Sequence, residues 1–132
     1  MIKIVLTVML ATSVLFCYEM DYTKDTVSLV NKKKVYKEPK WVAKIELKNG
    51  KKVFFVSPKS MIEFYHHPGK WFEVGVKSED DFKDIIVTDF TTGKPINARG
   101  AFYVYGSNMI SPAGDDLPAF ATYEAADNYA KK

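Results

Sequence analysis

The sequence predicts an α+β fold in which small antiparallel sheets carry two helices, arranged as two ββα-type lobes. Three observations support this class. Strands come as hairpins joined by short turns, and each group of strands is followed by a segment with the apolar spacing of a helix. In addition, 47% of the 132 residues are hydrophobic and 27% are charged, as in folded globular proteins.

The first half of the chain predicts a hairpin followed by a helix. Within residues 41–56, apolar residues alternate with Lys44 and Glu46, which is typical of a strand with one buried face. Asn49-Gly50 then favours a two-residue type I′ turn, because both residues tolerate positive φ. The helix is predicted over residues 58–67, with Ser57 as N-cap, Pro58 at its first position and Pro68-Gly69 after its end.

The second half predicts short strands before a last helix. β-Branched and aromatic residues predict strands over 85–90, 96–98 and 101–105. Residues 107–119 are rich in Ser, Asn, Pro, Gly and Asp, and we expect a loop there. The last helix is predicted over 121–131, with Thr122 as N-cap.

Residues 1–17 have the pattern of a secretory signal peptide or a lipoprotein signal: Lys3, an apolar run, and then a polar chain. Cys17 follows the run and is the candidate for lipidation, although Phe16 stands where a lipobox carries a small residue. Ordinary cleavage and an uncleaved anchor remain alternatives. We therefore expect a periplasmic protein, either soluble or tethered to the membrane. Residues 18–40 are polar and lysine-rich, and predict a tether with an irregular lead-in to the α+β domain at 41–131.

Composition and motifs argue against several other functions. A single cysteine allows no intramolecular disulfide and no CxxC pair. The net charge of +3 comes without a nucleic-acid-binding motif, so we expect no nucleic-acid partner. The sequence has no G-x-S-x-G nucleophile motif, no EF-hand spacing and no phosphate-binding glycine loop. We therefore do not expect an enzyme.

Residues 36–131 resemble the nitrous oxide reductase accessory protein (NosL) family. The resemblance begins at the hairpin and helix, over residues 41–65. It continues through four motifs of the NosL pattern: V-x-D-Y-x-T-G (87–93), A-x-Y-V-x-G-S (101–107), P-M-G (112–114) and P-F before the terminal helix (118–120). Each motif alone has low specificity, but their order and spacing together are specific to the family pattern.

The resemblance implies two small strand-helix lobes and a role as an exported metallochaperone. Members of the family bind Cu(I) and help to assemble the copper sites of periplasmic nitrous oxide reductase. The implied partners are that enzyme or its assembly factors.

Two departures from the family pattern remove expected copper ligands. Family members carry a Cys-Gly-Met segment before the first strand, whereas residues 31–37 contain neither cysteine nor methionine. The P-M-G turn is Pro112-Ala113-Gly114, so alanine replaces its methionine. The alternative function is a periplasmic protein-interaction module of the same fold that has lost metal binding.

The remaining candidate copper ligands are Met109, His66, His67 and Met20, because Cu(I) favours thioether and thiolate ligands and accepts imidazole. Met109 lies in the predicted loop, four residues before Ala113. The histidine pair ends the first helix, so both rings reach one ion only if the helix stops there. Convergence of these side chains favours copper binding, and their dispersal over opposite faces favours the interaction module.

Overall fold

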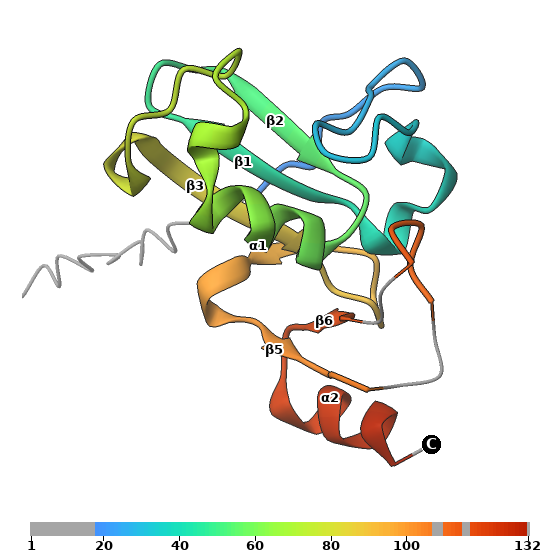
Figure 1. The fold of residues 1–132 in the computed structure, drawn as a ribbon. Helices are drawn as coiled ribbons and strands as arrows, with labels where there is room; N and C mark the ends of the chain where they lie inside the picture. The colour runs from blue at the N-terminus through green and yellow to red at the C-terminus, as the bar shows by residue number, and fades with distance from the viewer. Residues whose placement is uncertain (1–17, 107–109, 115–116, 132) are drawn as a thin grey trace, which may run out of the picture.

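The computed structural model describes residues 18–106, 110–114 and 117–131, and in these it forms two antiparallel sheets, each with one helix (Figure 1). The larger sheet has the strand order β2-β1-β3-β4 and the smaller pairs β5 with β6. The strands are β1 (Ala43–Leu47), β2 (Lys52–Phe55), β3 (Phe82–Thr88), β4 (Pro95–Asn97), β5 (Phe102–Tyr103) and β6 (Ala119–Phe120). The helices are α1 (Pro58–His66) and α2 (Tyr123–Ala130). The predicted α+β class is confirmed.

The larger sheet combines strands from both halves of the sequence. β3 pairs antiparallel with β1 along its length, beginning with Ala43 opposite Val87. The smaller sheet contains a strand that the sequence did not predict, because β6 lies at the end of the expected 107–119 loop. A parallel bridge between Asp89 and Ala119 joins the two sheets, and the Phe90 amide donates to the Ala119 carbonyl at 2.8 Å.

Helix α1 covers one face of the larger sheet, and α2 packs on the smaller sheet (Figure 1). Ser57 caps α1 as predicted, since its hydroxyl accepts from the Ser60 amide at 3.2 Å. Phe64 of α1 lies at the centre of the main core, with its ring centroid 5.5 Å from that of Phe55 and 5.9 Å from that of Phe82. Thr122 likewise caps α2 by accepting from the Ala125 amide.

The turn between β1 and β2 differs from the predicted type I′ turn. Gly50 has a φ of +87°, but Lys32 is the only non-glycine residue with positive φ in the part of the chain that the structure describes. Asn49 therefore does not take the conformation that a type I′ turn requires. The Gly50 amide donates to the Leu47 carbonyl at 2.9 Å, and the Leu47 amide to the Lys51 carbonyl at 2.8 Å. These bonds close a three-residue loop in which glycine supplies the left-handed position.

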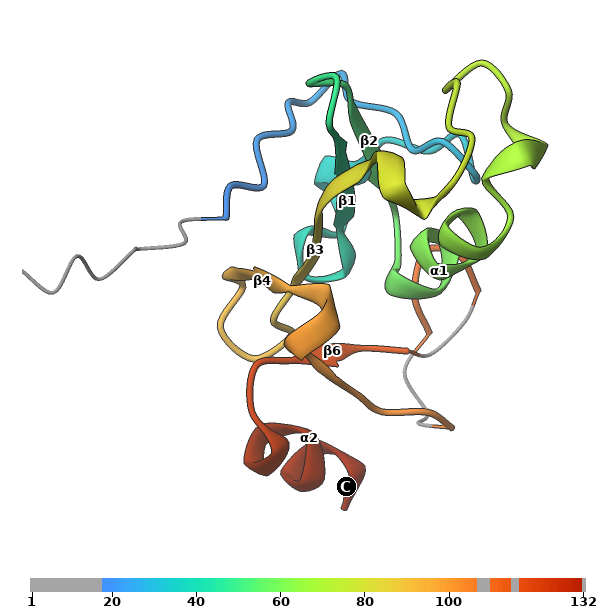
Figure 2. The ribbon, with the colours of Figure 1, turned by 90° about the vertical axis from the view of Figure 1, so that its left-hand side faces the viewer.

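The lysine-rich segment before β1 belongs to the folded domain and is not a free tether. It starts on the face of the sheet opposite α1 and wraps around the edge of β2 (Figure 2). There the Leu29 amide donates to the Phe54 carbonyl at 2.9 Å, and Asn31 accepts from the Ser60 hydroxyl at 2.8 Å. The segment then returns to bury Val35, which is 1% exposed. Its few apolar residues hold it on the sheet despite its charge.

Lys44 of β1 is buried on the face opposite α1, with only 2% of its surface exposed. Its ammonium group donates to the backbone carbonyl of Glu19 at 2.8 Å and to the Asp21 carboxylate at 2.7 Å. Lys52 of β2 binds the other oxygen of the same carboxylate. A buried lysine is costly unless its charge is paired and its donors are satisfied. The start of the described chain therefore docks where it can satisfy Lys44.

Two opposing effects set the pKa of Asp21. Burial is the largest single influence and raises the pKa. The hydrogen bonds from Lys44 and Lys52, a backbone hydrogen bond and the charge of Lys44 together outweigh it and lower the pKa from 3.8 to about 2. The Asp21 carboxylate is thus ionised in the folded protein at pH values well above 2.

No helix within the described residues is long and apolar enough to cross a membrane.

We predict that replacing Lys44 destabilises the protein, and that the cost is larger when the new side chain leaves a larger cavity. Lys44→Ala should cost about 2–4 kcal/mol of unfolding free energy, because it leaves a partly buried carboxylate short of one partner and opens a cavity. Lys44→Met should cost less, because it refills the volume. Urea denaturation measures both. Lys48→Ala, at an exposed position just beyond the same strand, is the control and should change stability by less than about 0.5 kcal/mol. Equal costs for the Lys44→Ala and Lys48→Ala variants would contradict the docking role.

We also predict that Asp21 contributes to stability in a defined pH range. Because its folded pKa is lowered, its contribution is complete above about pH 4 and disappears as the pH falls towards 2. Asp21→Asn should lower the unfolding free energy by about 1 kcal/mol at pH 7, allowing for solvent screening, and by much less at pH 2. Denaturation of both proteins across this range, with Asp80→Asn as an exposed control, measures the difference. A difference that does not change with pH argues against the ion pair.

Candidate metal-binding residues

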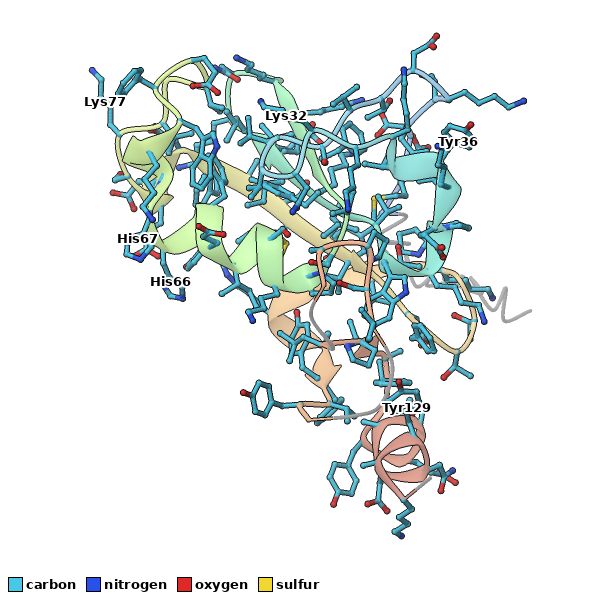
Figure 3. All side chains as sticks on the ribbon, turned by 45° about the vertical axis from the view of Figure 1, so that its right-hand side comes forward. Lys32, Tyr36, His66, His67, Lys77 and Tyr129 are labelled. Carbon is cyan, nitrogen blue, oxygen red and sulfur yellow. The ribbon has the colours of Figure 1, made fainter. Side chains whose placement is uncertain are left out.

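His66 and His67 lie together at the exposed end of α1 (Figure 3). The helix ends at His66, and the His67 amide makes the last turn by donating to the Glu63 carbonyl at 3.0 Å. The two imidazole centroids are 6.5 Å apart and the rings are tilted by 58°. The Tyr65 ring packs nearly perpendicular to the His66 ring, with their centroids 5.3 Å apart. The helix thus ends between the two histidines, as we expected for two rings that bind one ion. Both rings are exposed on the surface.

Met20 lies on the other face of the larger sheet. It is partly buried in a small cluster built on Val35, Val42 and Val56, together with Phe54. Phe54 points away from α1, because its neighbours along β2 pack into the core beneath that helix. Lys44, opposite Phe54 in the register, points the same way and bonds to the residues on either side of Met20. The ion pair therefore holds Met20 in place.

The predicted ligands consequently do not converge on one site. The sheet separates Met20 from His66 and His67, so these three side chains cannot bind the same ion. In the described ranges no three His, Cys, Asp or Glu side chains are grouped in a way that could hold a metal ion. The other described methionine, Met61, is a core residue with 3% exposure and is not available as a ligand. Met109 and the lipidation candidate Cys17 lie outside the described residues.

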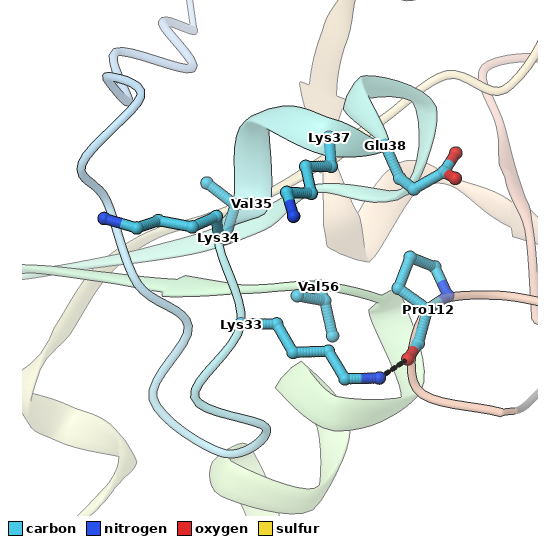
Figure 4. A pocket seen from close by; sticks show the side chains of 7 residues that line it. All are labelled: Lys33, Lys34, Val35, Lys37, Glu38, Val56 and Pro112. Atoms are coloured by element: carbon cyan, nitrogen blue, oxygen red, sulfur yellow. Dashed lines mark hydrogen bonds between the residues drawn. The ribbon is translucent and has the colours of Figure 1, made fainter.

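The two segments that depart from the NosL pattern meet in space. The Lys33 ammonium donates to the Pro112 carbonyl at 2.6 Å, which ties residues 31–37 to the 112–114 turn (Figure 4). A pocket of about 390 Å³ lies between them. Ala113 packs into the same cluster as Met20. The turn, the lysine-rich segment and the Met20 thioether therefore form one neighbourhood, which we call the Met20 region.

Three lysines line this pocket, in the segment where the family resemblance implies soft ligands. They are Lys33, Lys34 and Lys37, and the other lining residues are Val35, Glu38, Val56 and Pro112. A lysine ammonium has three donors and no lone pair, so it cannot ligate copper while it is protonated. Of the described residues in the Met20 region, the thioether of Met20 is thus the side chain suited to Cu(I). That Met20 and Ala113 pack on the same apolar cluster could not be seen in the sequence, since 93 residues separate them.

Comparison with known proteins gives a family and a fold. The NosL family model matches residues 19–132. The crystal structure of the copper chaperone NosL from Shewanella denitrificans superposes with a TM-score of 0.73, at 17% sequence identity, and the match covers 87% of each chain. A search of curated proteins finds no match.

The family match includes most of the lysine-rich segment as well as both sheets. It begins at Glu19, whose carbonyl binds Lys44, and includes Asp21, whose carboxylate binds the same lysine. This agrees with the structure, in which that segment is part of the domain. The chain belongs to the NosL family.

Proposed function

We propose that this protein is an exported copper-binding accessory protein that carries Cu(I) and supplies it during assembly of the copper sites of nitrous oxide reductase. Membership of the NosL family supports this proposal, as does the similarity of the fold to a protein described as a copper chaperone. The observation that carries it is the position of Met20, whose thioether lies in the same cluster as the 112–114 turn. We propose a carrier and not a catalyst.

The proposed site lies in the Met20 region, with Met20 and Met109 as thioether ligands. Met109 is three residues before Pro112 in the sequence, and three residues span at most about 11 Å. The chain therefore keeps Met109 within about 11 Å of Pro112, and we propose that its sulfur joins Met20 in the site. Cys17 is also three residues from Met20, and its thiolate would be a strong ligand wherever it is not lipidated.

The histidine pair is the weaker candidate. His66 and His67 offer two imidazoles without a soft ligand nearby, and the grouped carboxylate or thiolate that would complete a site is absent from the described residues. An exposed histidine at the end of a helix also has a structural role, because a cation there interacts favourably with the helix dipole.

The proposed location is the periplasm. This follows from residues 1–17, whose pattern is that of a signal peptide or a lipoprotein signal. Lipidation of Cys17 would anchor the domain close to the membrane, because Glu19, two residues later, already binds Lys44 of the sheet. The anchored domain would then lie on the same side of the membrane as nitrous oxide reductase or its assembly factors.

The alternative function is a protein-interaction module that no longer binds metal. The separation of Met20 from the histidine pair favours it, and so does the exposure of large apolar side chains. Phe72 is 87% exposed and Tyr105 is 84% exposed, whereas Trp71 and Tyr103 pack against the main core.

We predict that the purified chain from residue 17 onward binds one Cu(I) through its methionines. Met20→Leu and Met109→Leu should each weaken binding by about tenfold or more, because leucine preserves packing volume but cannot ligate. Competition with a chromogenic Cu(I) chelator under anaerobic, reducing conditions measures the affinity.

Two matched variants separate ligation from packing in this experiment. Met61→Leu changes a buried methionine of the main core and should leave the affinity unchanged. The double variant His66→Ala/His67→Ala should also bind like the wild type. Loss of binding in that double variant alone would move the site to the end of α1. Absence of binding above the chelator background would reject the copper proposal and favour the interaction module.

A further inference from the structure

A second pocket lies between α1 and the turn that precedes β5, far from the Met20 region. Its volume is about 260 Å³. The floor is apolar and consists of buried core residues, among them Met61, Ile85 and Ala98. Pockets of this kind, apolar with a few polar groups, are typical of sites for small organic ligands.

The polar groups of the pocket are cationic or neutral, and none of the described residues that line it is acidic. Arg99 is the only arginine of the chain, and its side chain is exposed at the rim together with His66. The Arg99 guanidinium forms no ion pair with any acidic residue in the part of the chain that the structure describes. An unpaired planar guanidinium is well suited to bind a carboxylate through two parallel hydrogen bonds.

The backbone that presents Arg99 is fixed by two hydrogen bonds. The side-chain oxygen of Asn97 accepts from the Arg99 amide at 3.0 Å and caps the short helical turn Ala98–Gly100. The Tyr103 hydroxyl donates to the Ala98 carbonyl at 2.6 Å. Burial raises the pKa of Tyr103 to about 12, so its hydroxyl keeps this proton at neutral pH. The backbone of Arg99 is thus fixed at the edge of an apolar cavity, and its exposed side chain lines that cavity.

We propose that this pocket binds a small organic carboxylate, with the apolar body on the Met61–Ala98 floor and the carboxylate on Arg99. Charge complementarity selects the anion, since the lining offers a guanidinium and no competing carboxylate. The apolar floor selects an aromatic or aliphatic body over a free inorganic ion. The site is independent of copper binding, because the larger sheet separates it from Met20.

The test compares three probes that differ in one feature each, using the chain from residue 17 onward. Phenylacetate has both the apolar ring and the carboxylate, phenylacetamide lacks the charge, and acetate lacks the ring. Phenylacetate should bind with a dissociation constant on the order of 1 mM, as expected for a ligand of about ten non-hydrogen atoms. The two partial probes should bind at least about tenfold more weakly. Titrations followed by NMR, with the imidazole signals of His66 as a local reporter, measure all three.

Arg99 variants test the role of the guanidinium. Arg99→Gln should weaken phenylacetate binding about tenfold, and Arg99→Lys should weaken it less, because the charge remains while the two-pronged geometry is lost. Lys94→Gln removes an exposed cation nearby in the sequence and should leave binding unchanged. The proposal is overturned if phenylacetamide binds as tightly as phenylacetate, if Arg99→Gln binds like Lys94→Gln, or if no saturable change occurs at His66.

Discussion

The arrangement of the protein depends on a lysine buried in the middle of a sheet. Lys44 lies on the face of β1 that α1 does not cover, and its charge must be paired because almost none of it is exposed. The pairing groups come from the segment before β1, at Glu19 and Asp21. As a result, a segment with few apolar residues is held against the sheet, and Met20 packs on the same apolar cluster as Ala113 of the 112–114 turn.

This constraint divides the candidate ligands between two sides of the molecule. The thioether of Met20 lies with the lysine-rich segment and the 112–114 turn, and the histidine pair lies at the end of α1 behind the sheet. Members of a family can keep a fold while its site changes, because the fold depends on the core and the site on a few side chains. In this chain the resemblance implies such a change at residues 31–37 and at Ala113, and we propose that Met20, which packs on the same apolar cluster as Ala113, supplies a soft donor there.

Local sequence signals predicted the helices well and the long-range contacts poorly. Ser57 and Thr122 cap α1 and α2 as predicted, since capping depends on residues only three positions apart. In contrast, alternation in β1 gave no sign that Lys44 would be buried, because its partner Asp21 lies 23 residues earlier in the sequence. The strand β6 was missed for a similar reason: two residues carry little periodicity, and pairing with β5 defines it. The packing of Met20 and Ala113 on one apolar cluster likewise arises only from the tertiary fold.

The most direct test of a copper site in the Met20 region is X-ray absorption at the copper edge of the Cu(I)-loaded chain, because it identifies the atoms bound to the metal. Binding in this region predicts a first shell of sulfur, from methionine and, where it is free, Cys17, without the outer-shell scattering that an imidazole ring produces. That result would assign the metal to the Met20 side of the sheet. A spectrum dominated by imidazole nitrogen would instead assign it to His66 and His67, and would contradict a central role for Lys44 in positioning the site.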